Sequence, residues 1–188
     1  KIKPSGGGRM SSVFFSLISP DKGVEIALGA AERLPEMDFH FYGRIEHGYE
    51  TAFRSKISGL QNACYHGVFD SVAGDVIREL NKYDVHLFPT LCPNEGVPGV
   101  IAETKMAGVP TVASDRSFNG ELVEDGVDGV LTHEDTPEEL AVILGRMMNA
   151  TETVNQMKTA ALASGKRYDI ETYISLLESE LIGSSEGM

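Results

Sequence analysis

Two glutamates flank a short stretch of glycine and proline in the second half of the chain. Glu95 and Glu103 are eight residues apart, and Gly96, Pro98 and Gly99 lie between them. If the whole stretch were helical, the two carboxylates would be about 12 Å apart along the axis, too far to hold one small group together. They could instead bind the two ends of an elongated ligand, because each carboxylate accepts hydrogen bonds from neighbouring hydroxyls.

A helix is expected to begin between these glutamates, near Pro98 or Gly99. Proline suits a first helical turn, where its missing N–H costs nothing. The amides of Gly99, Val100 and Ile101 would point out of the helix start and form an anion site suited to phosphate. A sugar joined through a diphosphate to a ribose has this layout. The alternative is also open, because a glutamate in a loop and another early in a helix are common surface residues.

Composition narrows the classes of partner. The chain has 188 residues and a formal net charge of −12, which argues against a nucleic-acid partner and against docking on an anionic membrane through this domain. No apolar run approaches the ~18 residues of a membrane span. Cys64 and Cys92 form no CxxC pair and no metal-ligand cluster, so we expect buried free thiols and no metal site.

Short apolar runs alternate with segments of helical periodicity. Strands are predicted at residues 12–18, 38–42, 63–66, 84–89, 109–114 and 129–131. Helices are predicted at residues 23–34, 49–58, 72–81, 98–107, 120–124, 137–149, 154–164 and 171–181. The alternation predicts an α/β fold: a Rossmann-like, doubly wound parallel sheet of about six strands with helices on both faces. Such sheets bind ligands beyond the carboxyl ends of their strands.

The segment from Glu95 to Glu103 resembles the EX7E motif of retaining glycosyltransferases of the GT-B fold, most closely family 4, the group 1 glycosyltransferases. Further stretches resemble that family in the same order along the chain: residues 85–89, 107–114, 119–121 and 124–129. The resemblance covers about residues 13–181, which is nearly the whole chain. Several patterns in the right order are more specific than any one of them.

The resemblance implies roles for this segment. Glu95 would lie against the transferred sugar and is the candidate catalytic residue, while Glu103 would hydrogen-bond the ribose. The amides of Gly99 and Val100 would contact the phosphates. The donor-binding candidates here are Glu95, Gly96, Pro98, Gly99, Val100 and Glu103.

A turn at residues 67–70 resembles the family segment that frames the nucleobase, mainly through backbone groups. Gly67 and Phe69 are therefore further donor-binding candidates. His66 comes just before this turn, and His86 falls within a predicted strand. Each is interpreted as a packed or solvated side chain and not as a catalyst.

Residues 19–23 resemble the family's donor-diphosphate loop, in which Lys22 supplies a point charge suited to a diphosphate. A solvent-facing lysine is the alternative, although a cation at a helix start opposes the helix dipole. The family usually has an arginine five residues earlier, where this chain has Leu17. We hypothesise that Arg44, which follows the second predicted strand, partly supplies that charge. Arg9 is a weaker candidate.

The resemblance also implies what lies around this domain. The donor would be a nucleotide-diphosphate sugar, bound without a metal or other cofactor. The predicted organisation is an interdomain linker remnant at residues 1–11, a nucleotide-sugar-binding domain at 12–182 and a flexible tail at 183–188. An N-terminal acceptor-binding domain would be missing, so this fragment alone is expected to be inactive. The acceptor could be a sugar, a lipid or a small molecule, and the expected location is the cytoplasm or the inner face of a membrane.

Two other function classes remain open. A catalytically inactive nucleotide-sugar-binding or scaffold domain is compatible with Leu17 in place of the arginine. A dinucleotide-binding or flavodoxin-like domain has less support, because no GxGxxG follows the first predicted strand.

Overall fold

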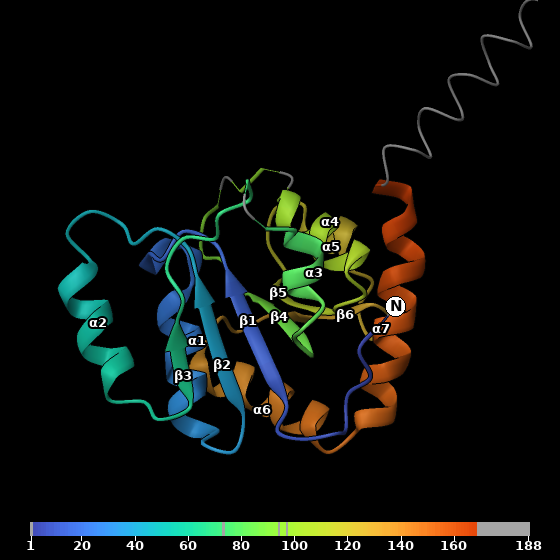
Figure 1. The fold of residues 1–188 in the computed structure, drawn as a ribbon, viewed down its shortest axis with the longest axis horizontal. Helices are drawn as coiled ribbons and strands as arrows, with labels where there is room; N and C mark the ends of the chain where they lie inside the picture. Colours follow the sequence, from blue (N-terminus) through green and yellow to red (C-terminus); the bar gives the residue numbers. More distant parts are fainter. Residues whose placement is uncertain (1, 73, 94, 97, 169–188) are drawn as a thin grey trace, which may run out of the picture.

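The computed structural model describes residues 2–72, 74–93, 95–96 and 98–168. Six strands form one parallel sheet in the order β3-β2-β1-β4-β5-β6 (Figure 1). The order reverses between β1 and β4, so their carboxyl ends flank the point where such sheets bind ligands. This confirms the predicted Rossmann-like fold. The strands are β1 (Ser11–Phe15), β2 (Asp38–Tyr42), β3 (Ala63–Tyr65), β4 (Val85–Phe88), β5 (Thr111–Ser114) and β6 (Gly129–Thr132).

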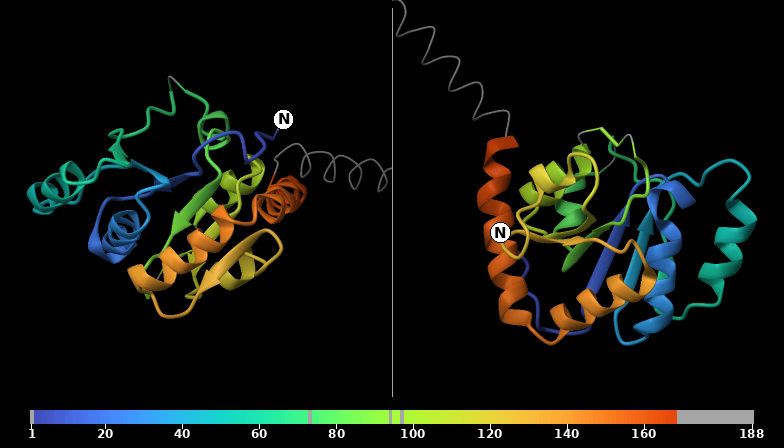
Figure 2. Two further views of the ribbon diagram at one scale, coloured as in Figure 1. Left: turned by 90° about the horizontal axis from the view of Figure 1, so that it is seen from below. Right: turned by 180° about the vertical axis from the view of Figure 1, so that it is seen from behind.

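Helices cover both faces of this sheet (Figure 2). Adjacent residues of β1 point to opposite faces: Phe14 packs with residues of α1 and α6, while Val13 packs with residues from α3 and the end of α4. α1 packs against α6, and α4 packs against α7. The helices are η1 (Pro20–Lys22), α1 (Val24–Arg33), α2 (Glu50–Ser58), α3 (Val76–Leu80), α4 (Gly99–Met106), α5 (Asn119–Leu122), α6 (Pro137–Met148), α7 (Thr151–Gly165) and η2 (Lys166–Tyr168).

The central strands are buried on both faces, which explains their continuous apolar character. Every residue of β4 and of β5 is buried, as expected for parallel strands covered by helices on both sides. The loops that leave their carboxyl ends therefore start from strands that are enclosed by packed side chains.

Several predicted element boundaries are wrong, among them the end of β1, the start of α3 and the start of α7, which begins at Thr151 and not at residue 154. β1 ends at Phe15 and not at residue 18; beyond it the chain keeps only irregular pairing on the β2 side, through a bridge between Ile18 and Ile45. α3 begins at Val76 and not at residue 72, because the Asp75 side chain accepts a hydrogen bond from the Arg78 amide at 3.2 Å and caps the helix there.

The segment before β1 is held against the domain at several points. The Ser5 amide donates to Asn155 of α7 at 2.8 Å, and the Ser5 hydroxyl donates to Asp84 at 2.7 Å. Lys158 of α7 donates to Asp84 at 3.0 Å and to the Lys3 carbonyl at 2.9 Å. The linker predicted at residues 1–11 therefore makes defined contacts with α7 and the start of β4. The helix predicted at 171–181 and the tail at 183–188 lie outside the described residues, and the domain boundaries stay predictions.

A second buried ion pair fixes the carboxyl half of α4. Lys105 pairs with Asp128, and both side chains are almost fully buried. Ser164 of α7 donates to the same Asp128 carboxylate at 2.8 Å and accepts from Lys105 at 3.1 Å. Burial lowers the pKa of Lys105, and the hydrogen bond and charge of Asp128 oppose that change. The helix that follows the glycine-rich loop is thus anchored at its far end.

Candidate functional site

The loops that follow β1 and β4 touch each other at the point where the strand order reverses. The Leu91 amide donates to the Asp21 carbonyl at 2.8 Å. Gly23 has φ +76°, and a Cβ there would lie 1.7 Å from the Pro89 carbonyl oxygen. Only glycine permits this approach, because a side chain would collide with the backbone of the other loop.

Lys22 and Glu95 form an ion pair across these two loops. The Lys22 Nζ lies 2.5 Å from Glu95 Oε2, and the side chains are 23% and 12% exposed. The structure therefore brings together the two charged residues that the sequence placed at the diphosphate and at the sugar. Direct pairing between them is not part of the sequence prediction.

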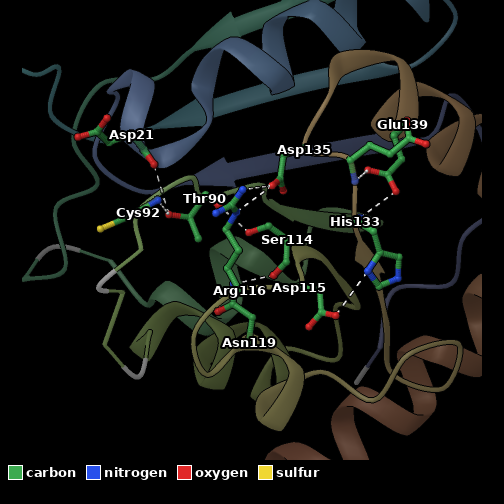
Figure 3. A network of polar contacts seen from close by, with 11 residues as sticks. Asp21, Thr90, Cys92, Ser114, Asp115, Arg116, Asn119, His133, Asp135 and Glu139 are labelled. Atoms are coloured by element: carbon green, nitrogen blue, oxygen red, sulfur yellow. Dashed lines mark hydrogen bonds and ion pairs between the residues drawn. The ribbon is translucent and has the colours of Figure 1, made fainter.

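Thr90 is a site residue that the sequence prediction missed. It is fully buried, and its hydroxyl lies 3.0 Å from Glu95 Oε2, to which it donates, and 3.4 Å from the Asp21 carbonyl. Its carbonyl accepts from the Ser114 hydroxyl at 2.7 Å, at the end of β5 (Figure 3). Thr90 thus links the Glu95 carboxylate to the end of β5, and its hydroxyl lies beside the loop that follows β1. The available signal was a hydroxyl residue directly after Pro89, where a strand leaves the sheet.

The start of α4 lies in the same loop. Pro98 caps the helix and Gly99 is its first residue, as predicted. The Ile101 amide donates to the Pro98 carbonyl at 3.0 Å, so the prediction that this amide points outward as a free donor is wrong. A Cβ built on Gly96 or on Gly99 would meet no described atom within 4 Å, so contacts within the described protein do not explain these glycines. Asn94 and Val97 lie outside the described residues.

Glu103 lies one turn into α4, as a partly buried side chain. Burial raises the pKa of its carboxyl. Among the residues that the structure describes, none donates a hydrogen bond to that carboxylate. A partly desolvated carboxylate without a protein donor is a good acceptor for ligand hydroxyls.

The turn at residues 67–70 lies beyond the ends of β2 and β3. Gly67 has φ +82°, and its carbonyl accepts from the Gly43 amide at 2.9 Å. The Phe69 ring packs on Phe15 and Tyr42, with centroids 5.7 and 6.3 Å away. The Phe69 ring is thus engaged in packing, and the role of the turn at a nucleobase stays a prediction.

Leu17 and Arg44 line one hollow of about 590 Å³. The Ile18 amide donates to the Arg44 carbonyl at 2.9 Å, which fixes the backbone of these two loops side by side. Arg44 is exposed, but the residues lining this hollow do not include Lys22 or Glu95. The structure thus brings Arg44 beside the position of the missing arginine, without placing it in contact with the ion pair.

The histidines lie beside the site or beneath it. His66 stacks on Tyr42 with centroids 4.5 Å apart, and its Nε2 lies 2.9 Å from His40 Nδ1. Burial lowers the pKa of both rings. His86 is fully buried in β4, where burial lowers its pKa to about 3 and keeps the ring neutral at physiological pH. The interpretation of His86 as a packed residue is confirmed.

In the part of the chain that the structure describes, no three His, Cys, Asp or Glu side chains are grouped so that they could hold a metal ion. Cys64 and Cys92 are free thiols, as predicted, but the prediction that they are buried is wrong, because Cys64 is exposed and Cys92 is partly exposed. No helix within those residues is both long and apolar enough to span a membrane. Metal independence and cellular location stay predictions.

Comparison with known proteins places the chain among sugar transferases. Residues 11–150 match the family model described as glycosyl transferases group 1. The amylovoran biosynthesis glycosyltransferase AmsK of Erwinia amylovora is 29% identical over 156 residues, which cover 78% of this chain and 38% of AmsK. The O-antigen biosynthesis glycosyltransferase WbnH of Escherichia coli is 25% identical over 174 residues, which cover 91% of this chain and 46% of WbnH.

A solved structure has the same fold. Anabaena HepE in complex with UDP-glucose superimposes with a TM-score of 0.78 and 26% identity, over 93% of this chain and 49% of HepE. The chain therefore spans less than half the length of each of these proteins. Since the family model covers most of the chain, and the sheet has the Rossmann-like topology of a GT-B domain, the chain belongs to the group 1 glycosyl transferases.

Proposed function

We propose that this domain binds the nucleotide-sugar donor of a retaining, family 4 glycosyltransferase. The observation that carries the proposal is the meeting of Lys22 and Glu95 at the point where the strand order reverses, beside the start of α4. A cation, a helix start and a carboxylate in one place match the charges and hydroxyls of a sugar diphosphate. HepE, which shares the fold, is described in complex with UDP-glucose, and this supports the same class of ligand here.

Each site residue then has a place along the donor. Lys22 and the first amides of α4, at Gly99 and Val100, bind the diphosphate. Glu95 accepts hydrogen bonds from the sugar, and Glu103, about 6 Å further along the helix axis than Gly99, accepts them from the ribose. The turn at residues 67–70 frames the base through its backbone.

The reaction breaks the bond between the anomeric carbon and the diphosphate oxygen, and the electron pair stays on the diphosphate. The acceptor hydroxyl oxygen forms the new bond and its proton passes to the departing diphosphate, and the configuration at the anomeric carbon is retained. Lys22 and the α4 amides would stabilise the negative charge that develops on the leaving diphosphate. Such fixed dipoles and charges act most strongly when water is partly excluded, as it is around Lys22 and Glu95.

The acceptor and its binding groups belong to a second domain of the same polypeptide in this proposal. The names of AmsK and WbnH concern amylovoran and O-antigen biosynthesis, which favours a sugar acceptor in cell-surface polysaccharide assembly on the cytoplasmic side. Without the second domain, this domain binds the donor without transferring it. Measurable sugar transfer by the purified domain would contradict that statement.

A second candidate is a nucleotide-sugar-binding domain without catalytic activity. Leu17 in place of the family's usual arginine favours it, because one of two expected cations is lost from the diphosphate loop. Assaying the full-length enzyme with a panel of donors separates the two candidates. Transfer supports the enzyme, and tight donor binding without transfer supports the binding domain.

Thermal unfolding of the domain tests donor binding itself. A ligand that binds only the folded state raises the unfolding midpoint, and 100-fold excess over Kd stabilises it by about 2.7 kcal/mol. We expect one of UDP, GDP or ADP, or its sugar derivative, to raise the midpoint in the wild type. Lys22→Ala removes most of that rise. The control Lys82→Ala changes an exposed lysine before the amino end of β4. This control should leave the ligand-induced rise in the unfolding midpoint unchanged. No shift with any of these ligands contradicts the proposal.

A further inference from the structure

The protein supplies Lys22 with a counter-ion of its own. Glu95 Oε2 accepts hydrogen bonds from both the Lys22 ammonium, at 2.5 Å, and the Thr90 hydroxyl, at 3.0 Å. Thr90 is fully buried, and the Glu95 side chain is only 12% exposed. The carboxylate is therefore neutralised by one specific cation in a place that water reaches poorly.

Any phosphate that binds the Lys22 ammonium must compete with this carboxylate. A phosphate that displaces Glu95 brings negative charge close to a carboxylate that has just lost its cation. Thr90 can keep only one hydrogen bond to it, because a hydroxyl has a single proton to donate. A partly buried carboxylate left in this condition is unfavourable, since it has lost protein partners without regaining full hydration.

The two ligands of the proposed reaction differ at this point. A nucleoside diphosphate offers only further negative charge to the displaced Glu95. A nucleotide sugar carries hydroxyl groups beyond the diphosphate, and these can donate to Glu95 in place of Lys22. The site would therefore discriminate between the two ligands because the nucleoside diphosphate leaves the Glu95 carboxylate without a hydrogen-bond donor in place of Lys22.

We propose that Glu95, through its ion pair with Lys22, makes the site prefer the sugar-bearing donor over the nucleoside diphosphate that remains after transfer. This inference rests on the proposed function and adds a specificity role to it. The same carboxylate that holds the sugar returns to Lys22 when the sugar has left. The leaving nucleotide is then displaced from its cation by a group already tethered within reach.

Binding affinities of two ligands in three proteins test this role. UDP and UDP-glucose, or the GDP or ADP pair if that base is the one that binds, are titrated into wild type, Glu95→Gln and Glu152→Gln. The glutamine keeps the shape of the side chain but removes its charge. The control removes one negative charge from an exposed residue in the first turn of α7, so it accounts for any general effect of net charge.

We expect Glu95→Gln to bind the nucleoside diphosphate at least threefold more tightly than wild type does, and to bind the nucleotide sugar no more tightly. The preference for the sugar-bearing ligand falls accordingly, whereas Glu152→Gln leaves both affinities unchanged. If Glu95→Gln unfolds, Glu95→Ala serves the same test and is expected to show the same gain for the diphosphate.

The outcomes separate this inference from the function on which it rests. If wild type binds both ligands and Glu95→Gln keeps the wild-type ratio of affinities, the specificity role is wrong and donor binding stands. A gain of similar size in Glu152→Gln also contradicts the role, because it assigns the effect to net charge. If neither ligand of any base binds to wild type, the proposed function and this inference both fail.

Discussion

The Lys158 Nζ lies 3.0 Å from Asp84 Oδ1, and both side chains are buried. Asp84 also accepts from the Ser5 hydroxyl and from the Ser11 amide, at 2.7 and 2.9 Å. One carboxylate thus joins α7, the start of β4 and the segment that leads into β1. Breaking a buried ion pair from one side leaves an uncompensated charge.

Lys158→Met is therefore expected to lower the free energy of unfolding by about 3 kcal/mol, near the lower end of what such a loss costs. Asp84→Asn has a similar effect, because it leaves the Lys158 charge buried. Chemical denaturation measures both, and Lys82→Ala provides the exposed-lysine control with a change near zero. Equal stability of Lys158→Met and wild type would show that the pair contributes nothing net.

The Asp84 carboxylate should also make the free energy of unfolding fall in acid. Burial alone raises the pKa of Asp84, but the hydrogen bond from Ser5 and the charge of Lys158 outweigh it, so the pKa is lowered overall. A lowered pKa in the folded state gives stability that is present above the unfolded aspartate pKa and is lost as pH falls through the folded value. The stability difference between wild type and Asp84→Asn should shrink over that acidic range.

Some features of the fold followed from the sequence because local signals set them. β2 was predicted with both ends right, since an apolar run ends at Gly43, whose φ of +143° and close approach to the Ser16 carbonyl require glycine. β1 was predicted too long. The apolar run continues to residue 18, but the pairing of β1 with β4 ends at Phe14. Strand pairing depends on the neighbouring strand and not on composition alone.

The candidate site was predictable in its residue types but not in its contacts. Lys22 and Glu95 are far apart in sequence, and their ion pair depends on how two loops fold against each other. Thr90 gave only a weak signal, because a buried hydroxyl after a strand is commonly structural. The free amide expected at Ile101 is already bonded to Pro98, because the first turn of α4 closes on its own capping residue.

Gly23 and Gly126 allow a matched test of the contact between the β1 and β4 loops. Both glycines have positive φ. A Cβ added at Gly23 would collide with the Pro89 carbonyl oxygen, whereas a Cβ added at Gly126 would meet no described atom within 4 Å. Gly126→Ala is expected to cost about 1 kcal/mol from the left-handed backbone alone. Gly23→Ala should cost clearly more and also weaken donor binding in titration calorimetry. Equal stability losses in the two variants would mean that the loops adjust freely.

Arg44 is expected to add a second positive charge near the diphosphate. Arg44→Ala should weaken donor binding roughly tenfold, equivalent to about 1.4 kcal/mol, with little change in stability because the side chain is exposed. Arg54→Ala on α2, where the side chain is 58% exposed, is the control and should leave the affinity unchanged. If donor affinity survives Arg44→Ala intact, the hypothesis that Arg44 partly supplies the missing charge is wrong.

Glu103 is expected to lower the stability of the folded domain at neutral pH while strengthening nucleotide binding. Burial raises the pKa of its carboxyl, so the folded state holds its proton more tightly than the unfolded state. That linkage lowers stability as pH rises from the unfolded pKa through the folded one. Glu103→Gln should therefore raise the unfolding midpoint at neutral pH while weakening nucleotide binding. A lower midpoint together with unchanged binding would contradict the assignment of Glu103 to the ribose.

In the wild type, the decrease in donor affinity at acidic pH should reflect protonation of the Glu103 carboxylate. The ionised carboxylate is the better acceptor for ribose hydroxyls, so affinity falls as pH drops through the raised pKa of Glu103. Titration calorimetry across the weakly acidic range measures this fall. The Glu103→Gln variant should lack it, and a fall of equal size in that variant would assign it to a different group.

Backbone amide shifts in an NMR titration test most directly whether the donor lies along the Glu95–Glu103 segment. Adding the nucleotide sugar identified by thermal shift to labelled domain should move the amide signals of Gly96, Gly99 and Val100 most, together with those of the turn at residues 67–70. Signals from the middle of α6 should stay in place. Changes concentrated on α6 and α7, with the α4 start unaffected, would contradict donor binding at this site.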